Sequence, residues 1–400
     1  MNYPKVILSS GKDQSLKRFH PWVFSGAIKK IKSQEGKEIK PEEGAIVEVY
    51  SNHDEYLGTG HFQIGSIAIR IISFTKQNIN QEFWNHKIGD ALNVRKIAGL
   101  VDNSETNVYR LIHAEGDGLP GLIVDFYNGT AVIQSHSIGM HLAKQQITEA
   151  LKTTLGNSLK AIYDKSEDTL PKQSAVKATN QILFGRPETN TVKENGHLFE
   201  VNWETGQKTG FFIDQRDNRA LLSSFCKGKS VLNTFCYSGG FSVYALKAGA
   251  SLVHSVDSSA KAIDLVNNTI QLNFGDIAHH TSFVSDTFDF MKDKKDVYDI
   301  IILDPPAFAK HQDVKHNAVQ GYKRLNAEAI RLIKKGGILF TFSCSQAVDK
   351  YLFNSTIMSA AIQAGRNVRV LYQLHQPIDH APCIFHPEGE YLKGLVLLVD

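Results

Sequence analysis

Three aspartates follow short, mostly apolar segments in the C-terminal half of the sequence. Asp257, Asp286 and Asp304 each come at or just after the end of a predicted β-strand. In open α/β sheets, ligands bind outside the carboxyl ends of the strands, so these side chains are expected at one edge. A carboxylate there can accept hydrogen bonds from ribose hydroxyls or meet an adenine edge. The three acids predict a nucleoside ligand, although any one of them alone could be only a helix cap.

A loop of small and aromatic residues joins an earlier predicted strand, 229–234, to the following helix. It consists of Phe235, Cys236, Tyr237, Ser238 and Gly239. Glycine allows a ligand to approach the backbone, and a helix N-terminus favours a negative group. The loop matches neither GxGxxG nor GxxxxGK[ST], so the fingerprints of dinucleotide binding and phosphoryl transfer are missing. With the acids, it predicts an adenosine ligand without a pyrophosphate, which favours S-adenosylmethionine (SAM) over NAD or ATP.

Cys344 follows a further predicted strand, within Phe-Ser-Cys-Ser-Gln, and is expected at the same edge as Asp304. A thiolate that adds to C6 of cytosine makes C5 nucleophilic enough to accept a methyl group, and loss of the C5 proton then releases the thiol. Asp304 could hydrogen-bond or protonate the base at N3 or its exocyclic amine. The alternative is that Cys344 is a small buried hydrophobe, as most free cysteines are.

Alternating strands and helices must position these residues. From about residue 195 the predicted strands are 229–234, 251–256, 282–284, 298–303 and 338–342, and the predicted helices are 241–248, 259–273 and 320–335. Near-continuous apolar strands that alternate with helices predict a doubly wound, parallel α/β sheet. Short strands before residue 75 predict a β-barrel, and a mixed pattern follows them. We expect three domains: 1–75, a barrel; 76–180, α+β; and 181–400, Rossmann-like.

Composition excludes several classes of protein. The chain has 400 residues, of which 42% are hydrophobic and 21% charged, which is typical of a folded globular protein with more than one core. Its four cysteines show no CxxC or Cys/His spacing, so we expect neither a disulfide scaffold nor a metal site. No signal peptide or apolar run long enough for a membrane span is evident, which favours a cytoplasmic protein.

Positive charge is concentrated near the N-terminus. Residues 1–40 contain nine lysines and arginines against three acids, a net charge of +6, although the whole chain carries only +3. Such a segment is the electrostatic footprint expected of a contact with a phosphate backbone. A solvated lysine face that keeps the protein soluble explains the charge equally well.

Six segments also match a known family. They are 17–28 (KRFHPWVFSGAI), 110–125 (RLIHAEGDGLPGLIVD), 204–219 (ETGQKTGFFIDQRDNR), the pair DPP at 304–306 and SCS at 343–345, and 390–395 (EYLKGL). Over essentially its whole length the chain resembles the bacterial large-ribosomal-subunit methyltransferase I family. These enzymes are SAM-dependent rRNA cytosine-C5 methyltransferases with an N-terminal PUA domain, an RNA-binding β-barrel.

The resemblance implies roles for individual residues. Cys344 would be the nucleophile, with Asp304 assisting. SAM would be held by Gln215, Arg219, Phe235, Cys236, Tyr237, Ser238, Gly239, Asp257, Ser258, Asp286 and Asp304. Gln215 and Arg219 would lie near the amino-acid end of SAM, with a structural salt bridge as the other interpretation of Arg219 and the expected one for Arg216. Many RNA cytosine-C5 enzymes carry a second cysteine where Pro306 stands, so the base that removes the C5 proton is not identified.

The expected partner is large-subunit rRNA, naked or in an assembly intermediate, with no membrane contact and with a homodimer as one option. The barrel should grip structured RNA by shape and backbone. The expected phosphate contacts are Lys12, Lys17, Arg18 and Lys208. Trp22 and Phe24 could stack on bases, but alternation within a strand favours the core for both.

Two alternatives stay open. The first is an rRNA methyltransferase that acts on a base nitrogen, in which Asp304 and a stacking Phe308 hold the base and Cys344 only packs. The second is a non-catalytic RNA-binding assembly factor with a degenerate cofactor pocket. Loss of turnover with retained SAM binding in Cys344→Ala would favour covalent catalysis over both.

Overall fold

The computed structural model describes residues 3–172, 174–292, 294–308 and 315–400. The chain divides into two compact units. The first consists of 1–190 with two later segments, 201–211 and 378–389. The second consists of 191–200, 212–377 and 390–400. The division into three domains at 75 and 180 stays a prediction.

The first unit begins with a six-stranded sheet in the order β2-β6-β5-β4-β1-β3. The strands are β1 (Lys5–Leu8), β2 (Trp22–Phe24), β3 (Ile28–Lys32), β4 (Ile46–Tyr50), β5 (Tyr56–Phe62) and β6 (Ile67–Ser73), and the short helix α1 (Gln14–Lys17) lies between β1 and β2. Val6, Leu8, Val47 and Ile69 are fully buried and form the centre of its core. The strand-rich N-terminal region is therefore present as predicted.

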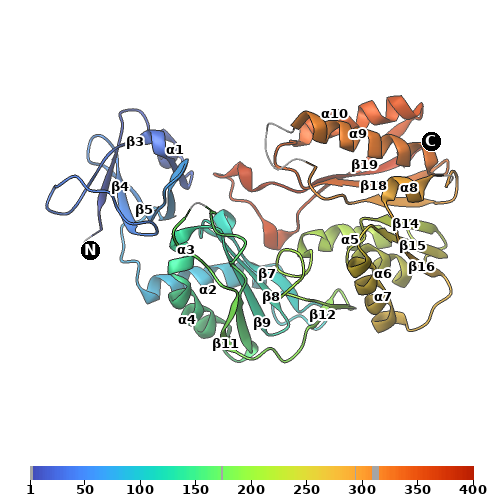
Figure 1. Ribbon diagram of the computed structural model, residues 1–400, viewed down its shortest axis with the longest axis horizontal. Coiled ribbons are helices and arrows are strands. Elements are labelled where there is room, and N and C mark those ends of the chain that lie inside the picture. The colour runs from blue at the N-terminus through green and yellow to red at the C-terminus, as the bar shows by residue number, and fades with distance from the viewer. Residues whose placement is uncertain (1–2, 173, 293, 309–314) are drawn as a thin grey trace. The chain divides into compact units, whose positions relative to one another are not determined.

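A second, five-stranded sheet follows in the order β11-β10-β9-β8-β7 (Figure 1). Its strands are β7 (Val108–His113), β8 (Leu122–Tyr127), β9 (Thr130–Ser135), β10 (Ala161–Asp164) and β11 (Gln181–Gly185); its helices are α2 (Gln81–Ile97), α3 (Ile138–Leu142) and α4 (Lys144–Leu155). The helices and this sheet share a core that includes Trp84, Leu111, Ile147 and Leu151. Helices α3 and α4 follow one another with only Ala143 between them.

Hydrogen bonds that involve buried charged side chains hold the two later segments against this sheet. Arg110 forms a two-point ion pair with Asp125 at 2.8 and 2.9 Å, and the Thr209 hydroxyl donates to the same carboxylate. Asp379 accepts a hydrogen bond from the backbone N–H of Arg110, while Arg95 donates to the Asp379 carbonyl at 2.7 Å. Segments 201–211 and 378–389 thus pack with the first unit although the sequence on either side of them belongs to the second.

The second unit is built on a seven-stranded sheet in the order β16-β15-β14-β17-β18-β20-β19. The strands are β14 (Ser230–Thr234), β15 (Leu252–Asp257), β16 (His280–Val284), β17 (Ile300–Leu303), β18 (Gly337–Ser343), β19 (Val368–His375) and β20 (Lys393–Val399). The first five are parallel, while β20 pairs antiparallel with both β18 and β19. The chain runs from β14 through β15 to β16 on one side of the sheet and then returns to β17 on the other side of β14. Such a reversal of strand order is where these sheets bind ligands.

Helices cover both faces of this sheet. They are α5 (Arg216–Ser223), α6 (Gly240–Lys247), α7 (Ala260–Phe274), α8 (Thr287–Met291), α9 (Lys315–Leu332) and α10 (Lys350–Ala364). Figure 1 shows α5, α6 and α7 on one face and α9 and α10 on the other. The buried strand residues Leu232, Ile301 and Leu339 lie in the core beneath α9 and α10. The predicted doubly wound α/β fold is confirmed.

A two-stranded hairpin completes the second unit. It consists of β12 (Thr191–Glu194) and β13 (His197–Glu200), joined by Asn195 and Gly196 with φ of 49° and 78°. Two-residue hairpin turns favour the sequence Asn-Gly with both residues in the left-handed backbone region. No helix in the described part of the chain combines the length and apolar character that crossing a bilayer requires.

Candidate cofactor and catalytic site

The loop from β14 to α6 has an unusual backbone. Phe235, Tyr237 and Gly239 have φ of 54°, 45° and 76°, so two non-glycine residues occupy the left-handed region. Such conformations cost energy and cluster at ligand-binding sites. A Cβ on Gly240 would lie 2.9 Å from Cδ of Arg219. The loop therefore lies directly over the arginine side chain, and only glycine fits at that point.

Asp257 joins this loop to the end of the neighbouring strand. Its carboxylate accepts hydrogen bonds from the backbone N–H of Tyr237 at 3.1 Å and of Ser259 at 2.9 Å, one on each oxygen. Each oxygen retains acceptor capacity, and the side chain is partly exposed at the carboxyl end of β15. Ser258 beside it is exposed. This carboxylate is oriented to receive two adjacent hydroxyls, as a ribose presents them.

Asp286 caps a helix as well as ending a strand region. Its Oδ1 accepts from the backbone N–H groups of Phe288 at 2.8 Å and Asp289 at 3.2 Å, at the start of α8. Both bonds go to one oxygen, and the residue is exposed. Asp286 therefore caps α8 through Oδ1, and its Oδ2 is the oxygen that could contact an adenine base.

Arg219 is held beneath the loop by a partner that the sequence analysis did not single out. Its Nε and Nη2 donate to the two carboxylate oxygens of Glu194 at 2.9 and 2.8 Å, and Nη1 donates to the Phe212 carbonyl. Both side chains are buried, and the Tyr244 hydroxyl donates to Glu194 at 3.0 Å. Arg219 thus supports the loop through a structural ion pair, the alternative that was kept for it.

Gln215 and Arg216 also lie inside the second unit. Gln215 is buried, and its Oε1 accepts a hydrogen bond from Asn218 at 2.7 Å. The Arg216 guanidinium is buried and lies 3.4 Å from Asp217. The ion pair expected for Arg216 is therefore present. Gln215 is held in one orientation at the start of α5, and α5 and β14 separate it in sequence from the loop 235–239.

The two expected catalytic residues end adjacent parallel strands. Asp304 follows β17 and Cys344 follows β18, and the two strands pair in register up to Leu303 and Thr341. Both Asp304 and Cys344 are partly exposed. By contrast, Cys226 and Cys236 are buried, and burial raises the pKa of each thiol, to about 12 for Cys226. The thiol of Cys344 is thus neither sealed in the core nor remote from Asp304.

Tyr322 lies near both Asp304 and Cys344. It lies fully buried on α9, and burial raises the pKa of its hydroxyl to about 12, with the charges of Cys344 and Asp304 acting in the same direction. The phenol is therefore close to both groups and keeps its proton at neutral pH. It is a protonated hydroxyl near the candidate nucleophile and the candidate acid, and no local sequence pattern pointed to it.

Lys393 places a positive charge near Cys344. It begins β20 opposite Ser343, and its ammonium donates to the carbonyls of Ser345 at 2.6 Å and Val348 at 2.7 Å. Burial lowers the pKa of Lys393, while the negative charge of Cys344 opposes that shift. A nearby ammonium favours a thiolate. A lysine at the start of the otherwise apolar strand KGLVLLV is the feature of the sequence that could have predicted this buried charge.

The residues present fit SAM. Asp257 offers a carboxylate at the reversal point of the sheet, beside a loop whose backbone is left-handed at Phe235, Tyr237 and Gly239. SAM supplies an electrophilic methyl group. Asp257 would hold the ribose hydroxyls, Oδ2 of Asp286 would meet the adenine, and the loop backbone would pack against the adenosine.

The expected RNA contacts of the N-terminal sheet are exposed but not equivalent. Lys12, Lys17 and Arg18 are all exposed. The Lys17 ammonium already pairs with Asp13 at 2.9 Å and Glu55 at 2.8 Å, so it is less available than Lys12 or Arg18 to bind a phosphate. Lys208, in segment 201–211, is exposed with φ of 51°.

The aromatic residues of β2 depart from expectation. Phe24 is 50% exposed, so its predicted core position is wrong, because Val23, at 3% exposure, is the residue of β2 that faces the core and the next side chain points to the other face. Trp22 is partly buried and donates to Glu115 at 2.9 Å. A pocket of about 310 Å³ is lined by Phe24 and Lys12 among others, which combines an aromatic surface with a positive charge.

Comparisons with known proteins agree with this architecture. Residues 119–373 match the family model for S-adenosylmethionine-dependent methyltransferases, and residues 6–74 match a PUA-like domain. Proteins named ribosomal RNA large subunit methyltransferase I are 36% identical over 398 residues in Alteromonas mediterranea and 37% identical over 401 residues in Aeromonas hydrophila. In both cases the alignment covers 98% of each chain.

Solved structures share the fold. A Streptococcus mutans protein solved as a candidate SAM-dependent methyltransferase superposes with a TM-score of 0.82 at 24% identity, covering 98% of this chain and 99% of that one. A candidate methyltransferase complexed with SAH gives 0.83 at 24% identity with the same coverage. SAM is thus the cofactor that the fold and the family share. The chain belongs to the S-adenosylmethionine-dependent methyltransferase family, among relatives that carry the name ribosomal RNA large subunit methyltransferase I.

Proposed function

We propose that this protein methylates C5 of a cytosine in large-subunit rRNA through a covalent bond between Cys344 and C6 of the base. The observation that carries the proposal is the position of Cys344. Its partly exposed thiol ends β18 beside Asp304 at the end of β17, with the buried Lys393 ammonium close by. The names of the relatives in Alteromonas and Aeromonas support rRNA as the substrate.

The Cys344 thiolate forms a bond to C6, and the electrons of the C5–C6 double bond make C5 nucleophilic. Asp304 accepts a hydrogen bond from the exocyclic amine or, when protonated, donates to N3 as charge develops there. After C5 has gained its methyl group, a base removes the C5 proton, the double bond re-forms, and the bond from C6 to sulfur breaks. Asp304 or a water held by it is the candidate base.

Lys393 and Tyr322 are positioning residues in this scheme. The Lys393 ammonium favours the thiolate form of Cys344 before attack and again when the thiolate leaves. The Tyr322 hydroxyl, which stays protonated, can donate to Asp304 or to the sulfur. Neither group needs to change its protonation state during turnover.

RNA binding is assigned to the PUA-like domain. The exposed Lys12 and Arg18 would contact phosphates, and the exposed face of Phe24 would stack on an unpaired base beside the pocket it lines. The target cytosine must leave its helix to reach a site at a sheet edge, so an unpaired or easily flipped base is the expected target.

Mass spectrometry of rRNA from cells lacking the protein tests the proposal as a whole. We expect the loss of one or more 5-methylcytidines from large-subunit rRNA and their return when the wild-type gene is supplied. Return with Cys344→Ala, or loss of a methyl group from a base nitrogen instead, would reject the covalent route. Intact methylation at every site would favour an assembly factor.

A further inference from the structure

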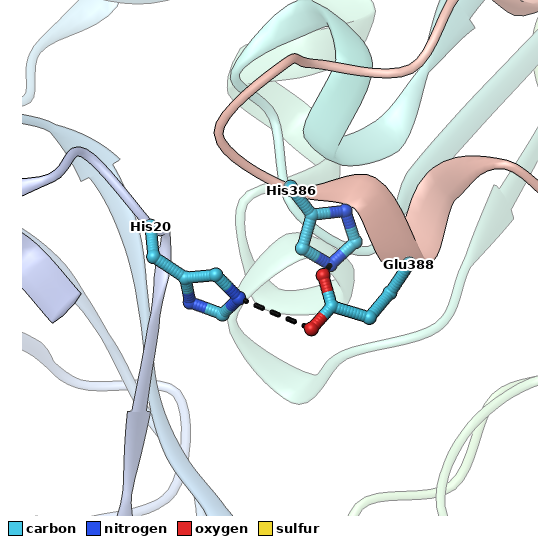
Figure 2. A group of neighbouring side chains, drawn as sticks. All are labelled: His20, His386 and Glu388. Carbon is cyan, nitrogen blue, oxygen red and sulfur yellow. Dashed lines mark ion pairs between the residues drawn. The ribbon is translucent and has the colours of Figure 1, made fainter.

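Two histidines and a glutamate converge away from the cofactor loop (Figure 2). His20 precedes β2, while His386 and Glu388 come from the segment 378–389, with Glu388 in the short helical turn Pro387–Gly389. His20 Nε2 lies 3.5 Å from one carboxylate oxygen of Glu388, and His386 Nε2 lies 3.8 Å from the other. One ligand atom from each residue falls within 4.8 Å of the other two.

His386 is the unusual member of the group. It is 3% exposed, and neither of its ring nitrogens has a hydrogen-bond partner among the described residues. Burying such a ring without partners is costly, so an unpartnered buried nitrogen indicates a missing ligand. The ring cannot easily turn away, because the Trp22 ring packs against it with centroids 4.4 Å apart. Its Nε2 is held toward Glu388, as Figure 2 shows.

We propose that His20, His386 and Glu388 bind a divalent transition-metal ion of the zinc class. Two imidazoles and one carboxylate are a ligand set that zinc uses, with water in the fourth position. With metal–ligand bonds of about 2.0–2.2 Å, neighbouring ligand atoms in a tetrahedral site are roughly 3.3–3.5 Å apart. The separations of 3.5 and 3.8 Å end on different oxygens of Glu388, and with one donor atom from each residue all three ligand atoms lie within 4.8 Å of one another. His20 and Glu388 are partly exposed and can close the remaining gap.

One adjustment is required: the backbone N–H of Trp22 donates to His20 Nδ1 at 3.3 Å. Binding through Nε2 places a proton on Nδ1 and breaks this long, weak bond.

Such a site would join the start of the N-terminal sheet to a segment near the end of the chain, both within the first unit. No sequence spacing could predict it, because its ligands come from opposite ends of the sequence. The expectation of no metal site was based on cysteine spacing alone. Trp22, whose ring packs against His386, is itself held by a hydrogen bond from its indole N–H to Glu115 at 2.9 Å.

The test is a zinc titration of the full-length, tag-free protein after treatment with a chelator. Affinity is read by competition with a chromophoric chelator, and geometry by the visible absorbance of cobalt in the same site. We expect one equivalent to bind and at least about a tenfold loss of affinity in both His20→Gln and Glu388→Gln. Both residues are partly exposed, so these variants should fold; circular dichroism checks this.

Two matched controls make the result specific. His86→Gln removes an exposed histidine that lies 3.4 Å from Asp90 but has no third ligand among the described residues, and Cys383→Ser removes the thiol nearest in sequence to His386. Zinc affinity should be unchanged in both. Substoichiometric zinc in the wild-type protein, or equal affinity in wild type, His20→Gln and Glu388→Gln, would overturn the proposal.

Discussion

The buried pair Arg219–Glu194 offers a quantitative test of how the cofactor loop is supported. Both side chains are nearly inaccessible, at 3% and 0% exposure, and two hydrogen bonds of 2.9 and 2.8 Å join them. Glu194→Gln leaves the arginine charge buried without a counter-ion. Breaking one partner of such a pair costs about 3–5 kcal/mol, because the remaining charge is uncompensated. For a unit of this size that corresponds to a Tm decrease of roughly 6–20 °C.

Differential scanning calorimetry measures this loss, and SAM affinity measures its effect on the loop above. Asp289→Asn is the matched control, because its ion pair with Lys292 is exposed and should contribute almost nothing. In the double variant Glu194→Leu/Arg219→Met the loss should be smaller than in Glu194→Gln, because no charge is stranded. A decrease in Tm no larger than that of Asp289→Asn, or a double variant worse than the single one, would refute the reasoning.

Further predictions concern the site and the RNA surface. Lys393→Met should move the rise of kcat/KM with pH to higher pH, because the ammonium that favours the Cys344 thiolate is gone; an unchanged pH profile contradicts this. Asp257→Asn should weaken SAM binding by about tenfold or more in calorimetry, the value of one to two hydrogen bonds to a charged group, and leave RNA binding intact. Lys12→Ala/Arg18→Ala should lower RNA affinity and reduce the salt dependence of binding by a slope of about one to two, with kcat at saturating RNA unchanged.

Strand-end chemistry could be predicted from the sequence because it depends on local patterns. The acids at or just after the ends of β15, β16 and β17 mark the ligand edge whatever the packing. Asp257 and Asp304 are predicted in this way from the sequence. Their neighbours Tyr322 and Lys393 were not, because only the pairing of β18 with β20 and the packing of α9 bring them to Cys344.

Elements whose residues break the usual periodicity were missed. Helix α10 exposes Tyr351, Met358 and Ile362 to solvent, so its apolar residues do not mark one face. The hairpin β12–β13 has an Asn-Gly turn that could have revealed it, and with it Glu194, the partner of Arg219. Phe24 was predicted in the core because β2 alternates, but the residue that this alternation buries is Val23.

The covalent step is tested most directly with RNA that carries 5-fluorocytosine at the target position. Fluorine at C5 cannot leave as a proton does, so the bond between sulfur and C6 should persist after methylation. The account predicts a SAM-dependent, denaturation-resistant protein–RNA adduct, mapped by peptide mass spectrometry to Cys344 and missing in Cys344→Ser. Efficient methylation of unmodified RNA by Cys344→Ser, or an adduct mapped to Cys236 or Cys383, would contradict it.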